Sequence, residues 1–125
     1  MRGILKRRNM HELGVVFYVI KDVKKVAEEN EIDKVDSVTL SIGEVSGILH
    51  DYLTDCWDWA KKREPVVENA ELKIETIKAV THCEDCGEDY ETVKYAKVCP
   101  KCGSENTYLV TGNEFVIKEI GVLDE

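Results

Sequence analysis

The sequence predicts an α+β protein in which a small sheet is packed by two helices and interrupted by an inserted zinc ribbon with four cysteines. Three observations lead to this prediction. Apolar residues recur at helical spacing in two stretches, alternate with polar residues in several others, and four cysteines form two Cys-x-x-Cys pairs. A chain of 125 residues can hold one modest domain with a real core plus a metal-stapled module.

Two amphipathic helices are expected, at residues 13–30 and at about 51–62, and Pro65 ends the second. Residues 10–12 stand at the entrance of the first helix, where the macrodipole favours an acidic Glu12. A lone cysteine inside a helix is more often a small core residue than a nucleophile. The positions expected to face the core are Val16, Val19 or Ile20, Val23 and Val26 or Ala27 in the first helix, and Tyr52 or Leu53, Cys56 or Trp57 and Ala60 in the second.

Alternating residues predict the strands of the sheet. Residues 38–42 indicate a half-buried strand that ends in a two-glycine turn at 43–47, where the chain can approach another backbone closely. Residues 71–77 predict a second strand, and residues 108–110 and 115–122 predict further strands. The cysteine-containing stretch is therefore an insertion between strands of the sheet.

The four cysteines have the spacing of a closed tetrahedral metal site. A glycine follows each Cys-x-x-Cys pair, which lets the backbone curl under the metal and point N–H groups at the sulfurs. Disulfides would be expected only in an exported chain, and the first nine residues lack the apolar core and cleavage site of a signal peptide. The expected ligands are Cys83, Cys86, Cys99 and Cys102.

Zinc is the metal that this pattern favours, and iron is its rival. Both knuckles also resemble those of rubredoxin, but rubredoxin has a much longer segment between them and little chain outside its metal site. A zinc ion held by four thiolates leaves no position open for substrate or water, so it folds the segment and does not catalyse. The function is then expected outside the ribbon.

Charge and hydropathy exclude two classes of partner. The formal net charge is −8, and phosphate-binding proteins usually concentrate Lys and Arg, so nucleic acid is not an expected partner. No apolar run reaches membrane-spanning length. Residues 1–9 hold four basic residues and no acidic ones, and they are expected to form a disordered extension. Met10 is the alternative start.

Three further stretches, together with the cysteine knuckles, carry a family resemblance. They are Met-His-Glu-Leu at 10–13, Leu-Ser-Ile-Gly-Glu-Val-Ser-Gly at 40–47 and Leu-Lys-Ile-Glu at 72–75. In this order, over residues 10–125, the chain resembles the HypA/HybF family of nickel metallochaperones. The resemblance implies a nickel-binding α/β domain at 10–79 and 108–125 and a zinc-ribbon domain at 80–107.

The resemblance also implies a nickel site at Met10, His11 and Glu12. Ni(II) favours planar nitrogen ligation, which an imidazole and ionised backbone amides can supply, completed by an α-amine if translation starts at Met10. Some family members carry an acidic nickel ligand at the position of Leu49. His50 or Asp51 can replace it after a small shift, or each can simply start the second helix, with Asp51 as its cap or as a first-turn anion.

By resemblance, the protein is a cytoplasmic carrier that takes Ni(II) and delivers it, with a HypB-type GTPase, to the large subunit of a NiFe hydrogenase or to another nickel enzyme. It is expected not to be an enzyme, because no nucleophile–base pair, phosphate loop or zincin motif occurs in the sequence. A structural zinc-ribbon adaptor without nickel transfer and a rubredoxin-like iron protein remain as alternatives. Whether the chain is a monomer or a homodimer stays open.

Overall fold

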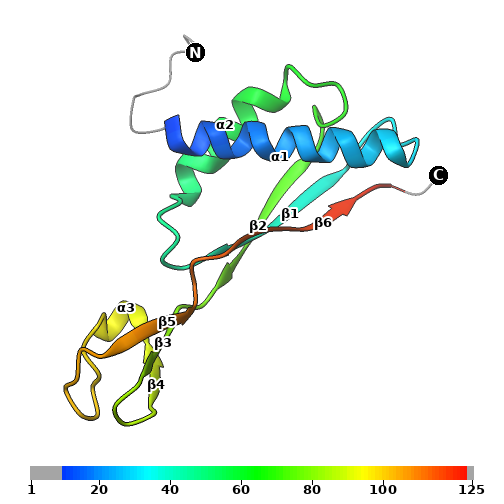
Figure 1. Ribbon diagram of the computed structural model, residues 1–125. Coiled ribbons are helices and arrows are strands. Elements are labelled where there is room, and N and C mark those ends of the chain that lie inside the picture. Colours follow the sequence, from blue (N-terminus) through cyan, green and yellow to red (C-terminus); the bar gives the residue numbers. More distant parts are fainter. Residues whose placement is uncertain (1–9, 124–125) are drawn as a thin grey trace. The chain divides into compact units, whose positions relative to one another are not determined.

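The structure is a computed structural model and describes residues 10–123, with the backbone alone described at Met10 (Figure 1). Residues 1–9, for which a disordered extension was expected, lie outside the described residues, as do residues 124–125.

The described chain contains three helices and two three-stranded sheets, which confirms the predicted α+β class. One sheet has the strand order β2-β1-β6 and the other the order β4-β3-β5. The elements in chain order are α1 (Met10–Glu29), β1 (Ser37–Gly43), α2 (His50–Lys61), β2 (Glu71–Ile77), β3 (Val80–Cys83), β4 (Asp89–Glu91), α3 (Thr92–Tyr95), β5 (Thr107–Thr111) and β6 (Phe115–Gly121). The second sheet lies between β2 and β6 in the sequence, which confirms the predicted insertion.

The chain divides into two compact units. The first, here called the helical unit, comprises the described residues 10–40, 48–74 and 117–123. The second, here called the ribbon unit, comprises residues 41–47 and 75–116. Strands β1, β2 and β6 each have residues in both units, so the segments that link the units are strands of one sheet.

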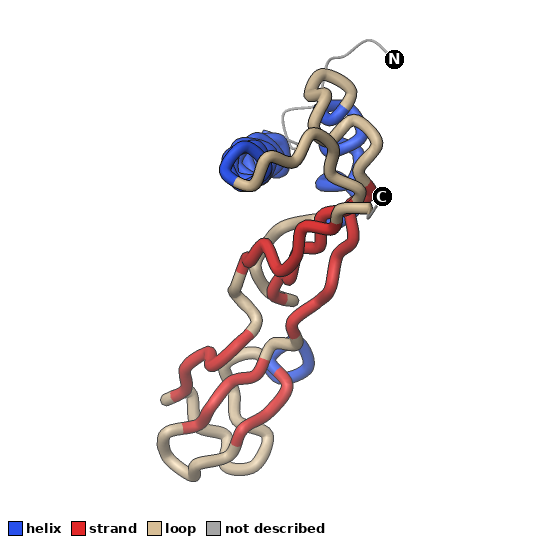
Figure 2. The backbone as a smooth tube through the Cα atoms, turned by 90° about the vertical axis from the view of Figure 1, so that its right-hand side faces the viewer, coloured by secondary structure: helices blue, strands red, loops and turns tan. Residues whose placement is uncertain are grey.

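The helical unit owes its core to α1 and α2, which pack against each other on the same side of the strands (Figure 2). The core positions predicted from helical spacing are confirmed. In α2 the buried residues are Leu53, Cys56, Trp57 and Ala60, and in α1 they are Val16, Val19, Ile20, Val23 and Ala27. The indole N–H of Trp57 donates to the carbonyl of Ala70 over 3.0 Å, which ties α2 to the segment before β2.

Two details differ from the sequence prediction. Helix α1 begins at Met10, three residues before the predicted start, so residues 10–12 are its first turn. Strand β1 was expected to be half-buried, but Ser37 and Thr39 are only 9% and 6% exposed. The prediction was wrong because β1 is the central strand, and neighbours on both sides cover its backbone and its short side chains.

Within the ribbon unit, the backbone of residues 43–45 lies very close to that of residues 112–114, in what is here called the backbone crossing. The N–H of Gly43 donates to Glu114 O over 2.7 Å, and the N–H of Val45 donates to Gly112 O over 2.8 Å. A Cβ atom on Gly43 would lie 2.0 Å from that Gly112 oxygen. The N–H of Ala79 donates to the carboxylate of Glu44 over 2.8 Å. The close backbone approach predicted for the glycine turn is confirmed at Gly43.

In the described residues 10–123, none of the helices combines the length and the apolar character that a membrane span requires.

Candidate metal centres

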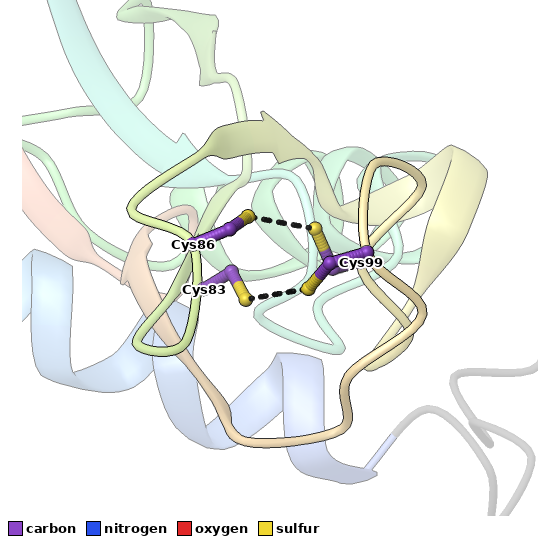
Figure 3. Close-up of side chains that lie close together, drawn as sticks. Cys83, Cys86 and Cys99 are labelled. Atoms are coloured by element: carbon purple, nitrogen blue, oxygen red, sulfur yellow. Dashed lines mark hydrogen bonds between the residues drawn. The ribbon is translucent and has the colours of Figure 1, made fainter.

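The four predicted ligands of the ribbon come together at one point. The sulfur atoms of Cys83, Cys86, Cys99 and Cys102 all lie within 4.8 Å of one another. The Sγ atoms of Cys83 and Cys102 are 3.6 Å apart, as are those of Cys86 and Cys99. Figure 3 shows the side chains of one knuckle facing those of the other. Two short loops, each with one Cys-x-x-Cys pair, thus place four soft donors around a single centre.

These separations fit a tetrahedral metal ion. A zinc–sulfur bond of about 2.3 Å places two thiolates of a tetrahedron about 3.8 Å apart. The observed 3.6 Å is close to this value. Cys83 and Cys99 are buried together with Tyr90 in the ribbon's own small core, so a bound ion would complete that core.

The glycines after each pair have the backbone conformation that the sequence predicted. Gly87 and Gly103 have φ angles of +80° and +75°, in the left-handed region that favours glycine. Each turn closes with a backbone hydrogen bond, from the N–H of Gly87 to Cys83 O over 2.9 Å and from that of Gly103 to Cys99 O over 2.8 Å. These glycines and backbone hydrogen bonds define the shape of both knuckles.

Backbone N–H groups also stabilise the thiolates. Burial raises the pKa of Cys99, but the N–H groups of Cys102 and Lys101 and the neighbouring thiols lower it to about 7. At Cys86 the N–H of Glu88 lowers the pKa, yet burial and the other three cysteines outweigh it and raise the pKa to about 12. Ionisation is thus favoured at Cys99 and opposed at Cys86, and a bound cation would offset that opposition.

His82 lies beside the cluster and is not part of it. Its Nδ1 is 2.6 Å from Oδ1 of Asp89, and its ring packs on Tyr108 with the ring centroids 5.3 Å apart. Among the described residues, His82 is therefore a neighbour of the cysteine cluster.

The nickel segment predicted at residues 10–12 forms the first turn of α1, and its two described side chains differ in environment. His11 is exposed, whereas Glu12 is only 2% exposed. Oε2 of Glu12 accepts a hydrogen bond of 3.0 Å from the backbone N–H of Leu49. Oε1 is buried and has no hydrogen-bond partner among the described residues. Sequence reasoning missed the bond to Leu49, because no local pattern relates residues 37 positions apart.

The start of α2 distinguishes between the roles considered for the residues after Leu49. Leu49 is the cap residue, His50 is the first helical residue and Asp51 lies in the first turn. Asp51 is therefore a first-turn anion and not the cap. In the described chain, the cysteine cluster is the only group of three or more potential ligands close enough to share an ion.

Cys56, the fifth cysteine, is fully buried in α2, which confirms its predicted place in the core. Burial, followed by the charges of Glu12 and Asp55, raises the pKa of this thiol.

A helical unit joined to a four-cysteine ribbon defines a small α+β metal-binding protein. The comparisons with known proteins agree. The family described as "Hydrogenase/urease nickel incorporation, metallochaperone, hypA" matches residues 10–122. The hydrogenase maturation factor HypA of Dehalococcoides mccartyi is 34% identical over 116 residues, which cover 93% of this chain and 97% of that protein. The protein of the same name from Chlorobium phaeobacteroides is 34% identical over 113 residues, covering 90% and 99%.

A solved structure gives the same result. The solution structure of the Ni metallochaperone HypA from Helicobacter pylori superposes with a TM-score of 0.66 at 27% identity, over 91% of this chain and 98% of that one. The chain belongs to the HypA family of nickel metallochaperones, which act in hydrogenase maturation. Members of this family carry a metal and convert no substrate, so the chain is not an enzyme.

Proposed function

We propose that the chain binds Ni(II) at Met10, His11 and Glu12 and delivers it to the large subunit of a NiFe hydrogenase or to another nickel enzyme. The observation that carries this proposal is the place of residues 10–12 in the first turn of α1, with the His11 imidazole exposed. The first four N–H groups of a helix have no intrahelical partner. Amides at positions 11 and 12 can therefore ionise and bind Ni(II) without breaking the helix.

This arrangement suits delivery. An exposed imidazole at a helix end lets a bound ion leave again, whereas a buried cage would hold it. Planar ligation by the imidazole and backbone nitrogens is a geometry that Ni(II) favours. In this proposal the nickel site lies in the helical unit and the zinc site lies in the ribbon unit.

For the ribbon we propose a structural zinc ion bound by Cys83, Cys86, Cys99 and Cys102. Four thiolates fill a tetrahedral site, so this ion folds the ribbon and does not take part in transfer. We further propose that the carrier works in the cytoplasm together with a HypB-type GTPase. The membership of the chain in a hydrogenase maturation family supports this assignment.

A Ni(II) titration of zinc-loaded protein tests the proposal. It compares the full chain, a form that starts at Met10, and His11→Ala. We expect one equivalent of Ni(II) to bind to the Met10 form and His11→Ala to abolish this binding. Comparison with the full chain shows whether residues 1–9 affect the site. If neither form of the chain binds nickel, the protein is a structural adaptor. A red preparation that contains iron would instead indicate the rubredoxin-like alternative.

A further inference from the structure

The side chain of Glu12 occupies an unusual place for a carboxylate in the first turn of a helix. It is buried to 98%, while the adjacent His11 is exposed. Removing a carboxylate from water is unfavourable unless hydrogen bonds or opposite charges compensate. The position of this side chain therefore depends on specific partners inside the helical unit.

The partner that the structure shows is the start of the second helix. Oε2 of Glu12 accepts the N–H of Leu49, and the carbonyl of Leu49 in turn accepts the N–H of Leu53 over 2.9 Å. Leu49 caps α2, and Glu12 itself lies in the first turn of α1. One carboxylate thus serves two helix N-termini, where the macrodipoles favour a negative charge.

The other carboxylate oxygen does not point to solvent either. Oε1 exposes less than 1 Å² and has no partner among the described residues. A nickel ion bound at the exposed His11 would have to draw this oxygen out of the interior and break the bond to Leu49. Such a movement would remove the anion from both helix ends.

We infer that the Glu12 carboxylate is a positioning group that locks the first turn of α1 to the cap of α2, and that it does not bind the nickel ion. This inference rests on the proposed nickel site and assigns the roles within it. The backbone nitrogen of Glu12 remains available to the metal, while its side chain holds that nitrogen and His11 in a single arrangement. Without the lock the first turn is free to fray, and nickel binding must order it first.

Three variants separate positioning from ligation in the Met10 form of the zinc-loaded protein. Glu12→Ala removes the acceptor of the Leu49 N–H. Glu12→Gln keeps an oxygen that can accept this N–H, but a neutral amide is a poor nickel ligand. Val16→Ala is the matched control, because it weakens the packing of the same helix one turn away without touching the lock.

We expect Glu12→Ala to weaken Ni(II) affinity roughly tenfold, which corresponds to the loss of one hydrogen bond to a charged group. Glu12→Gln should stay within about threefold of the parent protein and leave the Ni(II) absorption spectrum unchanged. Val16→Ala should stay within about twofold although it lowers the unfolding free energy. If Glu12→Gln changes the spectrum and loses as much affinity as Glu12→Ala, the carboxylate is a ligand and the inference is wrong.

A second measurement needs no nickel. Amide hydrogen exchange at Leu49 should be at least about tenfold faster in Glu12→Ala than in the parent protein, and near the parent rate in Glu12→Gln. Equal rates in all three proteins would overturn the lock. If nickel does not bind to the parent protein while Leu49 exchange responds as expected, the proposed nickel site fails and the lock stands as a structural feature alone.

Discussion

At the scale of single residues, Cys56 shows how strongly environment controls a thiol. It shares its residue type with the four ribbon cysteines, but it is fully buried and lies where Glu12 and Asp55 add negative charge. Burial and these charges raise the pKa of Cys56, so the thiol stays protonated at neutral pH.

Reactivity with a thiol reagent checks this description of Cys56. Without metal the ribbon loses its fold, so at neutral pH we expect its four cysteines to react quickly and Cys56 to react slowly. Raising the pH towards and beyond the ordinary thiol range should speed the slow phase, because thiolate is the reactive form. Cys56→Ala should abolish the slow phase and leave the fast one unchanged. Five equally fast cysteines would show that Cys56 is accessible.

Residue types and their spacing made the candidate metal ligands predictable, because Cys-x-x-Cys-Gly is a local pattern whose turn depends on the residues within it. The surroundings of Glu12 were not predictable in the same way. Its burial and its bond to Leu49 depend on how two helices pack, and the sequence around residue 12 shows only an acid near a helix start. Glu12 lies in the first turn of α1, where the macrodipole favours an acid, and its hydrogen bond to Leu49 places it at the start of α2 as well.

At the scale of elements, two glycines differ in whether the structure leaves room for a side chain. Gly43 lies in the backbone crossing of the ribbon unit, where a Cβ would come within 2.0 Å of the Gly112 oxygen. Gly14 lies inside α1, and an added Cβ there meets nothing within 4 Å.

Alanine substitutions at these two positions should therefore have effects of opposite sign. Gly43→Ala should lower the unfolding free energy by about 3 kcal/mol or prevent folding, because backbone atoms must move apart. Gly14→Ala should raise it by about 0.5 to 1 kcal/mol, since glycine is a poor helix former. Urea unfolding followed by circular dichroism measures both. A stable Gly43→Ala protein would show that the crossing is not tight.

The extent of most elements followed from periodicity, but their pairing did not. Residues 71–77 form β2 as predicted, whereas the order β2-β1-β6 depends on long-range contacts that alternation cannot specify. For the same reason the burial of Thr39 was missed. A polar residue in an alternating strand suggests an exposed face, and alternation does not reveal that β1 has a paired strand on each side.

At the scale of the whole molecule, the two units have different sources of stability. The helical unit has a core of aliphatic residues and Trp57. The ribbon's own small core contains two of the four cysteines and Tyr90, so its stability depends on a bound metal ion.

Removing the metal should therefore affect the units unequally. We expect a strong chelator, or acid that protonates the thiolates, to abolish the protected amides of β3, β4 and β5, while the helical signal of α1 and α2 persists. Protons and metal compete for the same sulfurs, so metal affinity should decrease as the pH falls. Cys56→Ser serves as the control and should keep the full metal content. Loss of both units in one transition would contradict this description.

The insertion of the ribbon between β2 and β6 also sets the order in which the protein can assemble during translation. All four cysteines leave the ribosome before Phe115–Gly121, the strand that pairs with β1 to complete the first sheet. A metal ion taken up at this stage folds the intervening chain and shortens the flexible connection that β6 must close, which lowers the entropic cost of closure. Metal supply to the nascent chain thus affects the sheet as well as the ribbon.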